Sequence, residues 1–305
     1  MKNFWAYLNE RFPLQANGVL IISYFTANYL LARGAVWGGE PLQISWRFVA
    51  GCIVLLFMFF HIRIIDEHKD YAQDLIVHPN RVLSRGLVTL ALLRRIGLGV
   101  VAVELILSFV LGWPSFVMCL LLLLISWLIF KEFYAGEVLN HNLLLNALLH
   151  MLVMPLYSLF VFSVATGHFP TDAPAAVLLY AWVSYGVGLG YELSRKTRAP
   201  QDERPGLITY SAVMGPYPAA FAALWALLFA GGISLAVGFL LDFGVWYHLT
   251  VAALLLVVAV GVVRFRLQTS TATAAHLPLY AGMFIFAFDV LLAVELIRLY
   301  GVVFV

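Results

Sequence analysis

Nine long apolar runs organise the sequence, and each has about the length that a helix needs to cross a lipid bilayer. The hydrocarbon core of a bilayer is about 30 Å thick, so a spanning helix takes roughly 20 consecutive apolar residues. The sequence therefore predicts an all-α, polytopic membrane protein in which nine transmembrane helices form one bundle. The runs lie near residues 17–37, 44–65, 86–110, 114–133, 142–165, 174–192, 217–240, 244–263 and 277–300.

The composition excludes a soluble protein. Hydrophobic residues make up 63% of the 305 residues and charged residues 11%, whereas about a quarter of the residues in soluble domains are charged. Residues 1–15 are too charged and aromatic for the apolar part of a signal peptide. Cys52 and Cys119 lie inside apolar runs, as buried cysteines do, and indicate neither a disulfide nor a metal site. We therefore expect one transmembrane domain over residues 1–305 in the lipid bilayer, with no nucleic acid and no obligate protein partner.

Basic residues predict the orientation of the bundle. If the N-terminus is cytoplasmic, most of the lysines and arginines fall at or near the inner side. Only Arg33, Arg47 and Arg298 fall near the outer side. Because cytoplasmic loops carry an excess of Lys and Arg, we expect the N-terminus and the basic loops on its side of the membrane to face the cytoplasm. We call this the inner side.

An acidic segment follows the second apolar run. Asp66, Asp70 and Asp74 are spaced four residues apart, so at about 100° per residue they stay on one face of a helix. Carboxylates on one face repel each other unless a cation lies between them. Mg²⁺ is bound by one or two carboxylates together with substrate phosphates, and this pattern favours such a site. A solvated acidic helix end is the alternative interpretation.

Two inner loops, residues 66–86 and 192–212, concentrate charge of both signs. A loop that only sets orientation needs bases alone, whereas a metal ion bound to a polyanion uses both signs. Each loop follows an even-numbered helix, so the two loops lie on the same side of the membrane. We expect them to cap a central cavity of the bundle that opens laterally to lipid.

These features resemble the UbiA superfamily of intramembrane prenyltransferases. That family has nine helices and a first motif, Asn-Asp-x-x-Asp-x-x-x-Asp, at the inner end of the second helix. Here the motif reads Asp66-Glu67-x-x-Asp70-x-x-x-Asp74. The family's following segment, Arg-Pro-Leu-Pro-Ser-Gly-Arg-Ile-Ser, is similar to residues 81–89. Its lysine near the end of the fourth helix matches Lys131.

The second acidic motif departs from the family pattern. Where the family has Asp-x-x-x-Asp at the inner end of the sixth helix, this chain has Glu192-Leu193-Ser194-Arg195-Lys196. Glu192 takes the first position. Lys196 is no metal ligand as an ammonium group, which leaves Asp202 or Glu203 to fold back as the missing ligand and Lys196 to contact the diphosphate.

The resemblance implies Mg²⁺-dependent ionisation of an allylic prenyl diphosphate with release of pyrophosphate. It implies that Asp66, Asp70 and Glu192 are catalytic. The expected metal ligands are Asp66, Glu67, Asp70, Asp74, Glu192, Asp202 and Glu203. The expected diphosphate ligands are Lys69, Arg81, Arg85, Lys131, Arg195 and Lys196. Ionisable residues inside a membrane are functional candidates by default, and for the cavity these are Arg94, Arg95 and Asp289.

Two outcomes compete once the allylic cation forms. Terpene cyclisation needs only a shaped cavity, whereas prenyl transfer needs a pocket for an aromatic or other lipid acceptor. Both acidic motifs are altered, and no acceptor-binding arginine is evident beyond Arg11 and the pair Arg94 and Arg95. The sequence therefore favours cyclisation of a prenyl diphosphate of diterpene length or longer.

A transporter is the alternative from another functional class. Transporters commonly show internal repeats and helices that are broken near mid-membrane at the binding site. In this chain the acids cluster at helix ends on one side, which favours an enzyme.

Overall fold

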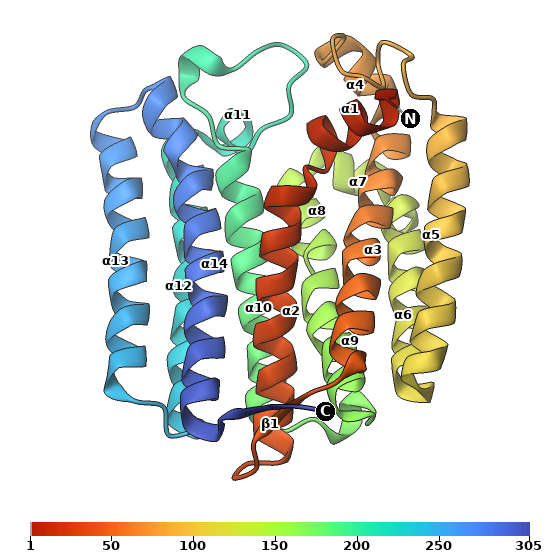
Figure 1. Cartoon of the computed structure of the whole chain (residues 1–305). Coiled ribbons are helices and arrows are strands. Elements are labelled where there is room, and N and C mark those ends of the chain that lie inside the picture. Colours follow the sequence, from red (N-terminus) through yellow and green to blue (C-terminus); the bar gives the residue numbers. More distant parts are fainter. Residues whose placement is uncertain (1) are drawn as a thin grey trace.

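The computed structural model describes residues 2–305, apart from the side chain of Asn140, and most of this range is helical. A short amphipathic helix precedes long helices that run roughly parallel to one another (Figure 1). In the first half of the chain the helices are α1 (Lys2–Arg11), α2 (Leu14–Val36), α3 (Trp46–Lys69), α4 (Tyr71–Val77), α5 (Leu90–Leu111) and α6 (Trp113–Phe130). Next come η1 (Glu132–Tyr134), α7 (Gly136–His141), α8 (Leu143–His150), α9 (Val153–Thr166) and η2 (Pro170–Asp172). The remaining helices are α10 (Ala175–Arg195), η3 (Pro200–Asp202), α11 (Tyr210–Met214), α12 (Pro216–Leu240), α13 (Val245–Leu267) and α14 (Thr271–Tyr300).

The predicted apolar runs coincide with helices, so the expected all-α membrane fold is confirmed. One run is interrupted: the helix expected over 142–165 is divided into α8 and α9 by a turn at Met151 and Leu152. Within the described range, seven helical segments are long and apolar enough to cross a membrane. Two predicted spans fall outside that set, α5, which carries Arg94, Arg95 and Glu104, and α10, which is rich in Gly, Ser and Tyr. The number of nine spans therefore stays a prediction.

Helix α10 lies inside the bundle, where it packs against α2, α9, α12 and α14. Glycines allow the close approach to α12. A Cβ atom on Gly186 would lie 2.9 Å from the carbonyl oxygen of Ala226, and one on Gly190 would lie 2.7 Å from the Leu227 side chain. Small residues at such contacts let membrane helices pack backbone to backbone. The position of α10 matters because its last turn carries Glu192 and Arg195.

The two ends of the bundle differ. At one end, strand β1 (Leu42–Ile44) pairs in parallel with strand β2 (Val302–Phe304), which joins the C-terminus to the loop after α2. At the other end, α1, α4 and α11 lie over the long helices (Figure 1). We call this the capped end. Helix α1 is held there because the Glu10 carboxylate accepts a hydrogen bond of 3.2 Å from the backbone N–H of Val82.

Candidate functional site

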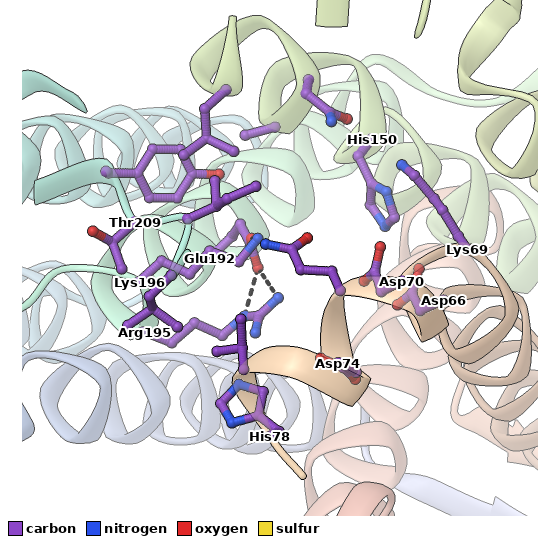
Figure 2. Close-up of a pocket in the computed structure, with 18 of the residues that line it drawn as sticks. Asp66, Lys69, Asp70, Asp74, His78, His150, Glu192, Arg195, Lys196 and Thr209 are labelled. Atoms are coloured by element: carbon purple, nitrogen blue, oxygen red, sulfur yellow. Dashed lines mark hydrogen bonds and ion pairs between the residues drawn. The ribbon is translucent and has the colours of Figure 1, made fainter. Parts of the chain in front are cut away.

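A pocket of about 550 Å³ lies at the capped end and brings together the two charged loops predicted from the sequence. Figure 2 shows Asp66, Asp70 and Asp74 on one side of it and Glu192, Arg195 and Lys196 on the other. The lining includes charged side chains from both loops and from α1, α3 and η1, namely Arg11, Arg63, Asp66, Lys69, Asp70, Asp74, Arg81, Glu132, Glu192, Arg195, Lys196 and Arg198. The site expected from the two motifs is therefore one compartment in space.

The first acidic motif bridges the end of α3 and the start of α4. Asp70 terminates α3 and directly precedes α4. Helical spacing continues across this junction, because the N–H of Asp70 donates to the carbonyl of Asp66 and the N–H of Asp74 donates to the carbonyl of Asp70, each at 2.9 Å. Residues four apart therefore stay on one side, and all three aspartates line the pocket.

Two acids of this motif are already neutralised by arginines. Asp74 accepts a hydrogen bond from Arg81 and lies 3.5 Å from the guanidinium of Arg11. Glu67 is 1% exposed and accepts hydrogen bonds from Arg11 at 2.6 Å and from Arg63 at 2.7 Å. Glu67 does not line the pocket. The structure thus places this expected metal ligand beneath α1, where it anchors Arg11.

Asp66 and Asp70 remain available to a cation. The nearest basic group to Asp66 is Arg63, at 3.8 Å. Among the described residues, no side chain forms a hydrogen bond or ion pair with the Asp70 carboxylate. Burial, and then the neighbouring carboxylate of Asp66, raise the pKa of Asp70 above its ordinary value. The charged form of Asp70 is therefore unfavourable in this pocket, and a bound cation would stabilise it.

The second motif forms a compact ion cluster at the end of α10. The Glu192 carboxylate, 7% exposed, accepts a hydrogen bond from Arg195 Nε at 2.5 Å and lies 2.9 Å from Lys196 Nζ. Asp202 and Glu203 do not fold back to it. Asp202 accepts a hydrogen bond from Thr271 at 2.9 Å, and Glu203 accepts hydrogen bonds from Thr209 and Ser211. Neither acid lines the pocket, because both hold the loop before α11 in place.

The expected diphosphate ligands divide into two groups. Lys69, Arg81, Arg195 and Lys196 line the pocket, and Lys69 Nζ lies 3.2 Å from Glu132. Arg85 and Lys131 are exposed and lie outside the lining. The ammonium of Lys131 instead lies 5.2 Å from the ring centre of Phe130.

The candidate cavity residues lie away from the pocket. Arg94 and Arg95 are exposed on α5. Asp289 is 3% exposed inside the bundle, where it accepts hydrogen bonds from Tyr180 at 3.1 Å and Ser23 at 3.5 Å. None of the three lines the pocket.

Several lining residues were not assigned to the site from the sequence. For Arg63 the sequence did contain a signal: it precedes Asp66 and Glu67 by three and four residues, so on a helix it lies beside both. His150 lines the pocket because the turn between α8 and α9 begins there. No local pattern identifies the other polar lining residues, which include Gln73, His78, Glu132, Asn146, Arg198, Thr209 and Tyr210.

The residues present fit one kind of metal site and not another. No group of three His, Cys, Asp or Glu side chains in the described part of the chain could hold a metal ion by itself. Mg²⁺, however, is usually bound through one or two carboxylates, with waters and substrate phosphates as the other ligands. Asp66 and Asp70 supply that pair at the pocket wall. They fit a magnesium ion that arrives with a phosphorylated substrate.

Comparisons with known proteins agree with this architecture. The structure is similar to digeranylgeranylglyceryl phosphate synthase, with a TM-score of 0.67, 15% identity and coverage of 98% of this chain and 100% of that one. It is also similar to an apo UbiA homologue from Aeropyrum pernix K1, with a TM-score of 0.66, 15% identity and coverage of 93% of this chain and 98% of that one. A UbiA homologue from Archaeoglobus fulgidus bound to GPP and Mg²⁺ matches with a TM-score of 0.52, 12% identity and coverage of 92% of this chain and 99% of that one. No curated protein matches the sequence.

The structural likeness establishes the fold, and the sequence itself establishes the family. The sequence model of the UbiA prenyltransferase family matches residues 20–288, which is most of the chain. The chain therefore belongs to the UbiA prenyltransferase family of integral membrane enzymes that act on prenyl diphosphates.

Proposed function

We propose that this protein ionises an allylic prenyl diphosphate in the pocket at the capped end, with Mg²⁺ as cofactor. One observation carries the proposal: Asp70, which has no ion pair among the described residues, and Asp66, whose nearest base is Arg63 at 3.8 Å, lie in one pocket with several basic side chains. Those side chains are Lys69, Arg81, Arg195 and Lys196. A diphosphate needs both a metal-binding edge and basic donors. The structure of the Archaeoglobus fulgidus homologue bound to GPP and Mg²⁺ supports the same ligand chemistry.

The reaction breaks the carbon–oxygen bond between the prenyl chain and the diphosphate. The electron pair leaves with pyrophosphate, and an allylic cation remains. Bound Mg²⁺ would stabilise the charge that develops on the leaving oxygens. Basic side chains of the pocket donate hydrogen bonds to the same oxygens, and such donors act most strongly where charge develops and water is excluded.

The prenyl chain is proposed to lie among the helices below the pocket. Apolar residues of α8 and the adjacent turn, Leu143, Ala147 and Met151, already line the pocket wall. An apolar lining keeps the allylic cation from water. A hydrocarbon depth of about 30 Å leaves room for a chain of diterpene length or longer.

We propose cyclisation as the fate of the cation: a double bond of the same chain attacks the cationic carbon, and the cyclic cation then loses a proton to give a hydrocarbon, or adds water and loses a proton to give an alcohol. The candidate acceptor arginines are engaged or distant: Arg11 is paired with Glu67, and Arg94 and Arg95 lie outside the pocket. Transfer to an acceptor is the second candidate. It is supported by the family description and by the fold shared with digeranylgeranylglyceryl phosphate synthase.

We also propose that the pocket faces the cytoplasm. Basic residues gather at the capped end, where Arg11, Arg63, Arg81 and Arg198 line the pocket. Cytoplasmic segments of membrane proteins carry this excess of positive charge.

One assay tests the enzymatic proposal. The purified protein in detergent is incubated with Mg²⁺ and, separately, with geranyl, farnesyl, geranylgeranyl and geranylfarnesyl diphosphate, and both pyrophosphate and extracted products are measured. Pyrophosphate and a cyclic hydrocarbon or alcohol are expected from the longer substrates without an acceptor. Products that appear only after addition of hydroxybenzoate, homogentisate, a naphthoate or a glycerol-phosphate lipid establish prenyl transfer instead. Absence of pyrophosphate under all these conditions refutes both fates.

A further inference from the structure

We infer that this pocket binds one divalent cation with its diphosphate, not two, and that the ammonium group of Lys196 supplies the second positive charge. The inference rests on the proposed function, since it concerns how the same site holds the diphosphate. Its starting observation is an asymmetry between the two acidic edges of the pocket. One edge has Asp70, which has no ion pair among the described residues, beside Asp66, whose only ion pair there is a long one of 3.8 Å to Arg63. The other edge has Glu192, whose carboxylate is already paired with two bases.

At the Glu192 edge, two basic side chains already neutralise the carboxylate, so it is not free to bind a metal ion. Both oxygens of the carboxylate are in use, one by Arg195 at 2.5 Å and the other by Lys196 at 2.9 Å. A divalent ion bound there would have to displace a guanidinium and an ammonium that follow Glu192 by three and four residues along the chain. It would then lie next to two like charges in a partly buried site, where repulsion is poorly screened.

No other acid of the second loop is placed to bind a metal ion in the pocket. Asp202 is held by Thr271, and Glu203 is held by Thr209 and Ser211, whose hydroxyls donate at 2.8 Å and 2.6 Å. Movement of Glu203 to the pocket would break the hydrogen bonds from two hydroxyls, that of Thr209, which is shared between both carboxylate oxygens, and that of Ser211. The second edge is therefore a cationic edge.

Lys196 is placed to act as that cation. It immediately follows α10, its Nζ lies 2.9 Å from Glu192, and it lies 5.9 Å from the ring centre of Tyr210. Glu192, Tyr210 and Lys196 all line the pocket. An ammonium group is a compact charge with three donors. It keeps one hydrogen bond to Glu192 and retains donors for the phosphate oxygens opposite Asp66 and Asp70.

The test counts metal ions per bound diphosphate. The full chain in detergent is mixed with Mn²⁺ and ³²P-labelled inorganic pyrophosphate and separated by rapid gel filtration, and manganese and label are measured in the protein fraction. We expect one manganese per bound pyrophosphate in the wild type. A ratio of two overturns the inference and leaves the proposed function intact. Absence of bound manganese overturns both.

Variants of Lys196 make the test specific. Lys196→Gln is expected to raise the dissociation constant for pyrophosphate roughly ten- to a hundredfold, the effect of losing one charged hydrogen bond, with the manganese ratio unchanged. Lys196→Arg keeps the charge and should bind pyrophosphate almost as tightly as the wild type. Lys2→Gln, an exposed lysine on α1, is the matched control for loss of charge.

Lys196→Asp provides the converse experiment. It places a carboxylate where the ammonium stood, and we expect the ratio to rise to two. Circular dichroism and the melting temperature establish that each variant is folded. If Lys196→Asp does not fold, Lys196→Gln still decides the question, because wild-type affinity for pyrophosphate in Lys196→Gln refutes the role of the ammonium.

Discussion

At the scale of single residues, the four acids of the first motif have different environments despite their regular spacing. Glu67 and Asp74 each contact arginines, whereas the Asp70 carboxylate has no such partner among the described side chains. Spacing along a helix identifies which residues share a face. It does not identify which of them a distant segment neutralises, and Arg11 reaches Glu67 from 56 residues away. The assignment of roles within the motif therefore required the structure.

Asp70→Asn is predicted to remove activity without loss of the fold. The amide cannot supply the ligand charge, and second-shell changes at metal sites alone cost roughly ten- to a hundredfold. A loss of at least about a hundredfold in turnover is thus expected here. Asp172→Asn, an exposed residue of η2, is the matched control. Turnover of Asp70→Asn near the wild-type rate, or unchanged wild-type turnover in EDTA, would contradict the assignment.

The same residue predicts a pH effect on the metal-free protein. Burial raises the pKa of Asp70 above its ordinary value of 3.8. Folding then favours the protonated form, so the contribution of Asp70 to stability is complete below pH 3.8 and is lost as the pH rises through the folded pKa. Asp70→Asn should therefore raise the melting temperature of the metal-free protein at neutral pH. A lower melting temperature than that of the wild type in EDTA would refute this.

At the scale of elements, the sequence located the helices well because hydrophobic length is a local property. Contacts between helices are not local. Helices α3 and α5 are joined inside the bundle by His61 and Glu104, whose Nδ1 and Oε1 atoms are 2.8 Å apart and whose side chains are 4% and 0% exposed. Each residue alone reads as an isolated polar group in an apolar run. Their pairing follows only from the arrangement of the two helices.

Removal of one member of this pair is predicted to destabilise the bundle. His61→Leu leaves the Glu104 carboxyl without its hydrogen-bond partner in an apolar surrounding, and leaving a buried polar group unsatisfied in this way costs about 1–3 kcal/mol. The double variant His61→Leu, Glu104→Leu removes both polar groups and should be closer to the wild type, since well-packed apolar replacements are often tolerated. Chemical or thermal denaturation of the three proteins measures the difference. Equal stability of the single and double variants would show that the pair has no such role.

At the scale of the whole molecule, the capped end differs from the opposite end in charge and in architecture. The capped end carries α1, α4, α11 and the pocket, whereas the other end is closed by strands β1 and β2 (Figure 1). The convergence of the two charged loops was predictable, because loops after even-numbered helices share a side. The loop conformation before α11 was not, because it depends on hydrogen bonds from Thr209 and Ser211 to Glu203.

This polarity predicts how the protein lies in the membrane. Arg204, exposed between α10 and α11, and Asp172, exposed in η2 between α9 and α10, are on connections that leave opposite ends of α10. If the basic capped end is cytoplasmic, Arg204→Cys should react with a membrane-impermeant maleimide only in inside-out vesicles, and Asp172→Cys only in right-side-out vesicles. The wild type is the control, since Cys52 and Cys119 lie within α3 and α6. Labelling in the reverse pattern would place the pocket on the outer side, where a cytoplasmic pool of prenyl diphosphate could not reach it directly.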